Sequence, residues 1–130
     1  MLKEEIKLLI VDDEEFLRMT LVAFLEDEGY MISSVSSGEE ALELISHQNF
    51  DIGIIDMKLP GINGNTLIIQ AHNIQPDMKF LIHTGSVNYF IPTNLSEIGI
   101  ITENILRKPV IDLHTIVKKI DKLLSNENSV

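Results

Sequence analysis

The chain of 130 residues contains no cysteine and no tryptophan, and it has only four prolines. Without cysteine it cannot form a disulfide framework, a thiolate nucleophile or a Cys-ligated zinc site, and this composition fits a reducing compartment. It also lacks an apolar run of membrane-spanning length, and its first residues lack the apolar core of a signal peptide. We therefore expect a cytoplasmic protein with no membrane insertion.

Positive charge is scarce as well: ten Lys and Arg stand against twenty Asp and Glu, for a net charge of −10. A surface of this charge repels a phosphate backbone, so we expect no direct nucleic acid binding by this domain, and we favour cationic partners and divalent metals. A chain of this length buries one core and is too short for two. We expect a single domain over residues 1–130, with a core from about 6 to 125 and a frayed tail at 126–130.

Short apolar runs alternate with stretches in which apolar residues recur at helical spacing. The expected strands cover residues 7–11, 30–35, 52–55, 79–82 and 104–107, and the expected helices have apolar faces within 17–25, 41–45, 67–71 and 113–124. Such alternation is typical of an α/β fold, here a doubly wound five-stranded parallel sheet with helices on both faces.

Local signals predict where several helices begin and end. Gly29 is expected to end the first helix, Ser37 and Glu40 have the spacing of a capping box, and Pro76 must follow the third helix. Pro92 excludes one continuous helix over residues 86–103 but can open a short helix that runs to Gly99. The last helix is expected to fray from Ser125 onward.

The central apolar run, residues 52–55, ends in Asp56 and is followed by turn signals. Asp56 therefore lies at the carboxyl end of a strand, the edge at which open α/β sheets bind ligands. Polar residues follow three other expected strands in the same way, namely Asp12, Asp13, Thr84 and Lys108. Because parallel strands all point the same way, these side chains can share one edge of the sheet.

This set of side chains suits phosphoryl chemistry. Crowded carboxylates raise one another's pKa unless a hard cation such as Mg²⁺ neutralises them. A carboxylate beside Mg²⁺, an ammonium and a hydroxyl is arranged to attack phosphorus. Simpler roles remain open for each residue: Asp12 or Asp13 as a helix cap, Asp56 or Thr84 as a turn residue, and Lys108 as a solvated strand end.

Taken together, these motifs resemble a receiver domain of bacterial response regulators, the group that includes the single-domain chemotaxis regulator. The shared features are the acidic pair Asp12-Asp13, Asp56 in Ile-Ile-Asp-Met-Lys-Leu-Pro-Gly-Ile-Asn-Gly, Thr84 in His-Thr-Gly, and Lys108 in Arg-Lys-Pro. The resemblance covers nearly the whole chain. It implies a flavodoxin-like fold with strand order 2-1-3-4-5.

The resemblance also implies a two-component or phosphorelay function, in which Asp56 accepts a phosphoryl group from a sensor histidine kinase or phosphotransfer protein. By the same resemblance, Mg²⁺ is held by Asp13, Asp56 and the Met57 carbonyl, and by Asp12 through water. The protein would catalyse only its own phosphorylation and dephosphorylation. It would signal by conformational change to an output protein that the sequence does not name. No effector domain follows the last helix, so output goes through protein contacts if these 130 residues are the natural chain, whereas a longer natural chain could carry a DNA-binding or enzymatic domain.

In the resembling family Thr84 and Lys108 would contact the phosphoryl oxygens, and the bond between Lys108 and Pro109 would be cis. One departure concerns the position three residues before the lysine, where the family usually carries Tyr or Phe and this chain has Ile105. The usual aromatic switch is therefore missing, which leaves open a phosphorylation-independent pseudo-receiver that acts as an interaction module.

Two other classes share parts of the pattern. A flavodoxin-like carrier of FMN would need a loop rich in Ser, Thr and Gly after the first strand, whereas Asp12, Asp13 and Glu14 would repel the FMN phosphate. A phosphatase of the haloacid dehalogenase type needs a second Asp two residues after the nucleophile, where this chain has Lys58.

None of the four histidines, His47, His72, His83 and His114, belongs to a ligand-spaced pair. Surface or packing roles are expected for them. His83 also lies beside Thr84, where it could tune the site.

Overall fold

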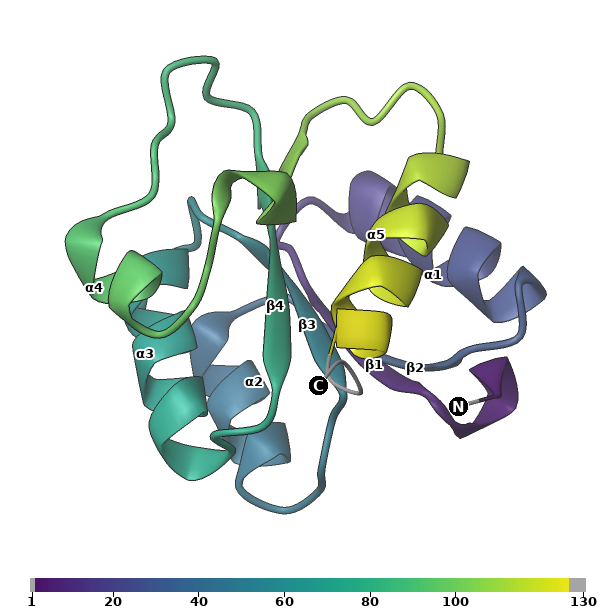
Figure 1. Cartoon of the computed structure of the whole chain (residues 1–130), viewed down its shortest axis with the longest axis horizontal. Coiled ribbons are helices and arrows are strands. Elements are labelled where there is room, and N and C mark those ends of the chain that lie inside the picture. Colours follow the sequence, from purple (N-terminus) through teal and green to yellow (C-terminus); the bar gives the residue numbers. More distant parts are fainter. Residues whose placement is uncertain (1, 127–130) are drawn as a thin grey trace.

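The computed structural model describes residues 2–126, with side chains for residues 2–125. In this part of the chain five strands form one parallel sheet in the order β2-β1-β3-β4-β5 (Figure 1). The strands are β1 (Lys7–Val11), β2 (Met31–Val35), β3 (Ile52–Asp56), β4 (Lys79–Thr84) and β5 (Ile105–Arg107). The doubly wound sheet and its predicted strand order are confirmed.

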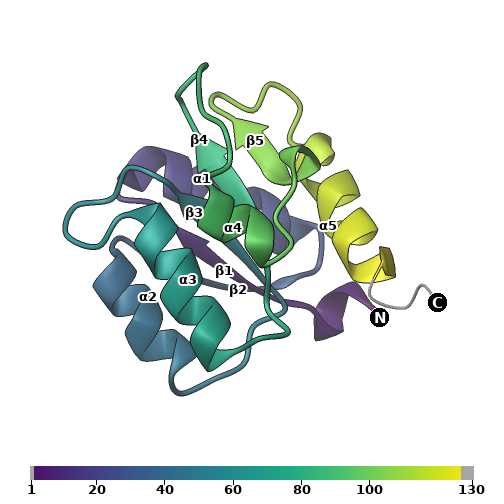
Figure 2. The same cartoon turned by 60° about the vertical axis from the view of Figure 1, so that its left-hand side comes forward.

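Helices cover both faces of the sheet (Figures 1 and 2). They are α1 (Glu15–Asp27), α2 (Gly38–Ile45), α3 (Gly64–Ile74), α4 (Thr93–Glu97) and α5 (His114–Asn126), with 3₁₀ turns η1 (Lys3–Glu5) and η2 (Thr102–Asn104). The apolar residues of α1 and α5 pack on one face, and those of α2, α3 and α4 pack on the other. Across the described residues, no helix is both long and apolar enough to cross a membrane.

Each face of the sheet has its own apolar core because successive strand residues point to opposite sides. In β1, for example, Leu8 and Ile10 face α1 and α5, whereas Leu9 and Val11 face α2 and α3. All residues of β3 are buried. The central strand is therefore buried on both faces, and the carboxyl edge of the sheet carries the polar residues discussed below.

Capping residues mark the starts of the two helices that precede and follow the central strand in the chain, α2 and α3. Ser37 accepts a hydrogen bond from the backbone N–H of Glu40 at 3.2 Å, as the capping box predicts, although the Glu40 carboxylate returns to the N–H of Ser36. Asn63 caps α3 by accepting from the N–H of Thr66 at 2.9 Å. At the end of α1, Gly29 has φ +109°, a conformation that favours glycine.

The least regular segment lies between β4 and β5. Pro92 is the N-cap of α4, as predicted, and the helix ends at Glu97, before Gly99. The fifth strand was expected to begin at Asn104, but this residue ends η2 and the strand begins at Ile105. The reason is a local bond: the Asn104 side chain is buried and accepts from the N–H of Ile101 at 2.7 Å, which holds the turn.

The last helix, which is expected to fray from Ser125, has helical geometry through Asn126; fraying of these two residues stays a prediction. Helical hydrogen bonding continues for about half a turn past the last apolar residue of the stripe, Leu124, and neither Ser nor Asn forbids it. The rest of the predicted frayed tail, residues 127–130, lies outside the described residues.

Candidate functional site

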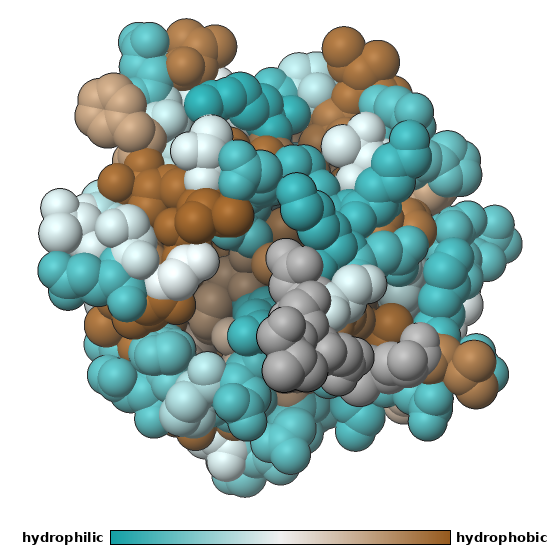
Figure 3. Space-filling view, viewed as in Figure 1, coloured by the Kyte–Doolittle hydropathy of each residue, from teal (hydrophilic) through white to brown (hydrophobic). Residues whose placement is uncertain are grey.

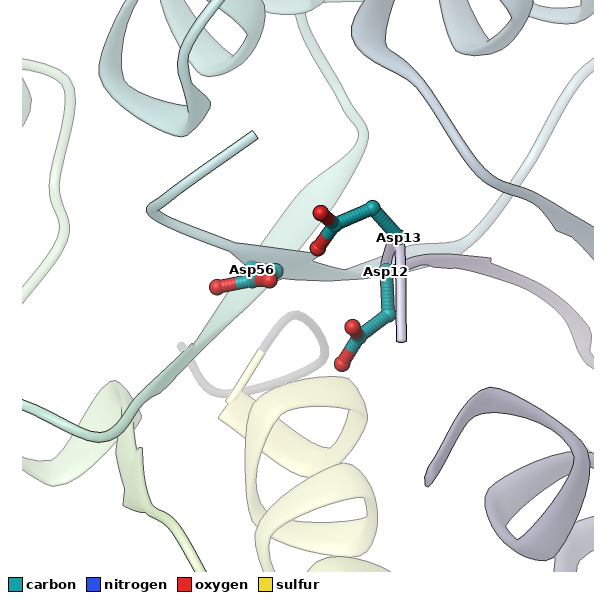
Figure 4. Close-up of side chains that lie close together, drawn as sticks. All are labelled: Asp12, Asp13 and Asp56. Carbon is teal, nitrogen blue, oxygen red and sulfur yellow. The ribbon is translucent and has the colours of Figure 1, made fainter. Parts of the chain in front are cut away.

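Three carboxylates meet at the carboxyl edge of the sheet. Asp12 and Asp13 follow β1 and Asp56 ends β3 (Figure 4), and each offers an oxygen within 4.8 Å of the others. They converge because β1 and β3 are neighbours whose ends are in register, with Val11 paired to Ile55. Asp12 and Asp56 are buried, 1% and 4% exposed, whereas Asp13 is exposed.

Asp12 is held by donors and cations that favour its charged form. Its Oδ1 accepts the backbone N–H of Glu14 at 2.9 Å, and its Oδ2 lies 3.2 Å from Lys108 Nζ. Burial opposes ionisation, but His83, the Glu14 N–H and Lys108 together outweigh it and lower the pKa of Asp12. Asp12 is therefore a fixed negative charge at neutral pH.

Asp56 is affected in the opposite direction. Its Oδ1 accepts the N–H of Lys58 at 3.1 Å, and its Oδ2 lies 3.3 Å from Lys108 Nζ. Burial is the largest influence, and the charge of Asp12 acts in the same direction, so the pKa of Asp56 is raised despite the Lys58 N–H and Lys108. The negative charge of Asp56 is therefore less well stabilised than that of Asp12.

Lys108 joins the acidic groups. Its Nζ lies 3.0 Å from Glu14 Oε1, in addition to its contacts with Asp12 and Asp56. Burial disfavours the ammonium, but the three carboxylates outweigh it and raise the pKa of Lys108. The peptide bond between Lys108 and Pro109 is cis, as expected.

Thr84 ends β4 at the same edge and is 2% exposed. Its carbonyl accepts the backbone N–H of Lys108 at 2.7 Å, which ties the ends of β4 and β5 together. Its hydroxyl oxygen accepts the N–H of Ser86 at 3.1 Å and so belongs to the loop that follows. The preceding residue, His83, is the one paired with Asp56 across the sheet.

The loop after Asp56 passes close to the site because Gly64 lies against it. The N–H of Gly64 donates to the Met57 carbonyl at 3.2 Å. A Cβ at Gly64 would lie 2.5 Å from the Asp56 carbonyl oxygen and 2.6 Å from Met57 Sδ, so no larger residue fits without backbone movement. The turn signals in the sequence therefore have a steric role at the site.

The donor set fits a hard divalent cation. Two buried carboxylates and one exposed carboxylate converge, and Asp12 Oδ2 accepts no hydrogen bond from the residues that the structure describes. Oxygen ligands with room for water are what Mg²⁺ prefers. Asp12, Asp13 and Asp56 could hold the ion, together with the Met57 carbonyl, which follows Asp56 directly.

Two residues near the site, His83 and Ile105, are not part of this donor set. Of the surface, packing and site-tuning roles considered for His83, burial excludes the surface role: the side chain is 3% exposed, and its Nδ1 lies 3.7 Å from Asp12 Oδ2. The sequence feature that could have indicated this contact is the position of His83 beside Thr84 at a strand end. Ile105 is partly buried and packs against the core on the α2, α3 and α4 side of the sheet.

Comparisons with known proteins identify the family to which the chain belongs. A family model described as "Response regulator receiver domain" matches residues 8–121. Sporulation initiation phosphotransferase F of Bacillus subtilis is 28% identical over 120 residues, which cover 92% of this chain and 97% of that protein. The two-component response regulator PhoP of Pseudomonas aeruginosa is 36% identical over 83 residues, which cover 64% of this chain but only 37% of PhoP.

Solved structures share the fold. The crystal structure of the response regulator TrrA from Thermotoga maritima, in complex with Mg(2+)-BeF, has a TM-score of 0.79 and 29% identity, and the match covers 91% of this chain and 98% of TrrA. A CheY-like receiver domain from Methanospirillum hungatei gives 0.76 and 28%, covering 94% and 96% of the two chains. With a matching family model over most of its length and the same fold, the chain belongs to the response regulator receiver domain family.

Proposed function

We propose that this protein accepts a phosphoryl group on Asp56 in a Mg²⁺-dependent reaction and signals through the resulting conformational change. The observation that carries the proposal is the convergence on Asp56 of one ammonium, from Lys108, and two further carboxylates, Asp12 and Asp13. An ion pair alone would not need this excess of acids. The electrostatic cost of gathering these carboxylates is understandable if a cation and a phosphoryl group bind at the same edge of the sheet.

In the proposed reaction an Asp56 carboxylate oxygen attacks phosphorus while the bond from phosphorus to the donor nitrogen breaks. Mg²⁺ held by Asp13, Asp56 and the Met57 carbonyl, and by Asp12 through water, would supply positive charge to the phosphoryl oxygens. Lys108 is already within 3.3 Å of Asp56 and can turn to those oxygens. The Thr84 hydroxyl can do so after releasing the Ser86 N–H.

We further infer that the donor is a sensor histidine kinase or a phosphotransfer protein, acting on this receiver domain in the cytoplasm. The similarity to sporulation initiation phosphotransferase F over nearly its full length supports a role in phosphoryl transfer. The protein would catalyse only its own phosphorylation and dephosphorylation. Its output would pass to another protein, and its net charge of −10 argues against nucleic acid as the direct target.

A pseudo-receiver that signals without phosphate is the second candidate, because Ile105 stands where a switching aromatic ring is usual. The two candidates differ in one measurable property, the ability of Asp56 to form an acyl phosphate.

Intact mass after incubation with acetyl phosphate and Mg²⁺ tests the proposal. The wild type should gain the mass of one phosphoryl group, Asp56→Asn should gain none, and EDTA should abolish the gain. Asp77→Asn is the matched control, since Asp77 is an exposed acid in the loop between α3 and β4, at the opposite end of the sheet. Equal labelling of wild type and Asp56→Asn would refute the assignment, and an unlabelled wild type would favour the pseudo-receiver.

A further inference from the structure

His83 is a buried polar side chain on the same side of the sheet as the acidic cluster. It follows Leu81 by two residues in β4, so both side chains lie on the face covered by α1 and α5. It is paired in register with Asp56, and its Nδ1 faces Asp12 Oδ2 at 3.7 Å. An apolar residue would fill this space without the free-energy cost of burying an imidazole. The presence of a polar ring here therefore needs an explanation.

The second observation concerns what holds Asp12. Its Oδ1 has a fixed donor in the Glu14 backbone, but its Oδ2 has only Lys108 Nζ, at 3.2 Å, and the more distant imidazole. Lys108 is shared with Asp56 and Glu14 and lies on a flexible stem. When Lys108 turns toward a phosphoryl group, Asp12 Oδ2 loses the Lys108 ammonium while it stays buried, which is unfavourable.

We propose that His83 is a positioning residue that donates a hydrogen bond from Nδ1 to Asp12 Oδ2 when Lys108 leaves for the phosphoryl group. A closing movement of about 0.5–1 Å brings the two atoms into hydrogen-bond distance. Asp12 thereby keeps its orientation toward the metal while Lys108 serves Asp56. This inference rests on the proposed function and adds to it a residue that lies behind the acidic cluster.

Two substitutions separate this role from packing. His83→Leu removes the donor and keeps an apolar side chain of similar size, whereas His83→Asn keeps an N–H near the position of Nδ1. His83→Leu should weaken Mg²⁺-dependent beryllofluoride binding about tenfold, as is typical when the outer partner of a metal ligand is lost. Its Mg²⁺ affinity in the absence of beryllofluoride should change by less than about threefold, because Lys108 still holds Asp12 in that state.

His83→Asn should restore beryllofluoride affinity to within about threefold of wild type. His47→Leu, an exposed histidine at the end of α2, is the control and should change neither affinity. Unchanged beryllofluoride binding in His83→Leu would overturn the proposal. So would an equal loss of both affinities, or an Asn variant as weak as the Leu variant, since either result indicates packing alone.

A measurement on the wild-type protein keeps the proposal testable if His83→Leu does not fold. Nitrogen-15 spectra of the imidazoles with Mg²⁺ and beryllofluoride should show a proton on His83 Nδ1, with a hydrogen-bonded shift that Asp12→Asn alters. A bare Nδ1 would overturn the proposal. If wild type binds beryllofluoride and labels at Asp56, a negative result concerns His83 alone, whereas a wild type that does neither removes both this inference and the proposed function.

Discussion

Asp12 and Asp56 end neighbouring strands and are both buried, yet their pKa values move in opposite directions. The difference lies in their partners. Asp12 faces His83 and Lys108 and accepts the N–H of Glu14, whereas Asp56 has one N–H and a share of the same ammonium. The residue proposed to react is therefore the one that the fold stabilises less in its charged form.

This imbalance predicts that Asp56→Asn stabilises the metal-free protein at neutral pH. Because the folded pKa of Asp56 lies above the ordinary value of 3.8, the folded state binds this proton more tightly, and stability is lost as the pH rises through the raised pKa. Removing the charge should therefore raise the Tm at pH 7.

Thermal unfolding in EDTA at pH 7 and at pH 4.5 measures this effect. The advantage of Asp56→Asn should shrink at the lower pH, where the wild-type carboxyl is increasingly protonated, and Asp77→Asn should show no comparable gain. An Asn variant that is less stable than wild type at pH 7 would mean that the Lys108 contact outweighs burial at Asp56.

Sequence reasoning located the acidic residues, Thr84 and Lys108 because strand ends can be identified from periodicity, and parallel strands bring their ends to one edge. The contacts of His83 and Glu14 could not be anticipated in the same way. Both depend on which way a side chain turns across two or three strands. His83 meets Asp12 across β3, the strand that separates β4 from β1 in the sheet.

At the scale of elements, the loop from β4 to α4 is held to β5 by one side chain. The Arg107 guanidinium donates to the Ser86 carbonyl at 2.7 Å and to that of Tyr89 at 3.4 Å. Val87 and Phe90 are each 82% exposed, and Figure 3 shows apolar groups over this loop at the upper left. The buried Tyr89 hydroxyl has no hydrogen-bond partner within residues 2–125, which makes this arrangement costly to keep.

We predict that phosphorylation reorders residues 86–91 through Thr84. Phosphoryl oxygens should draw the Thr84 hydroxyl inward, which breaks its bond to the Ser86 N–H and strains the Arg107 contacts. Ile105 offers no phenol that could alternate between a buried and a solvated hydrogen bond, and a branched aliphatic side chain has few rotamers to exchange. Hydrogen exchange with and without beryllofluoride should therefore change over residues 84–92.

Arg107→Ala should speed exchange in the same segment without beryllofluoride, by about three- to tenfold for the loss of roughly 1 kcal/mol of hydrogen bonding. Lys122→Ala, an exposed cation on α5, is the control. Changes confined to Asp12, Asp56 and their immediate loops would contradict the prediction and indicate phosphoryl acceptance without switching of this face.

Most elements could be predicted from hydrophobic periodicity and capping signals, but the side-chain hydrogen bonds that join one element to another could not. Gln75, which ends α3, donates from its side chain to the carbonyls of Ile45 and Gln48 and accepts the N–H of Phe50. This amide ties the end of α2 to the chain before β3. Its partners lie 25 to 30 residues away, so no local pattern announces them. The turn at residues 102–104 is a different case: its bond, from the Ile101 N–H to the Asn104 side chain, spans only three residues, but a single Asn does not distinguish a turn from the start of a strand.

For the whole molecule, a net charge of −10 together with a convergent acidic edge predicts stabilisation by divalent cations. A ligand that binds only the folded state adds about 2.7 kcal/mol at roughly 100 times its Kd. Millimolar Mg²⁺ should therefore raise Tm by several degrees beyond NaCl of equal ionic strength. Asp13→Ala should lose this increment, whereas Asp77→Ala should keep it. A wild-type Tm that does not respond to Mg²⁺ would count against the site.

The carboxyl edge has one more consequence, which concerns how the chain could be divided. The turn between α3 and β4, residues 75–78, lies at the far end of the sheet from the acidic cluster. A break there would leave the three acids on one fragment and Thr84 with Lys108 on the other. Neither fragment alone would carry all the residues proposed to bind the phosphoryl group. Labelling of Asp56 would then report reassociation of the two halves, which makes this turn a natural split point for a protein complementation assay.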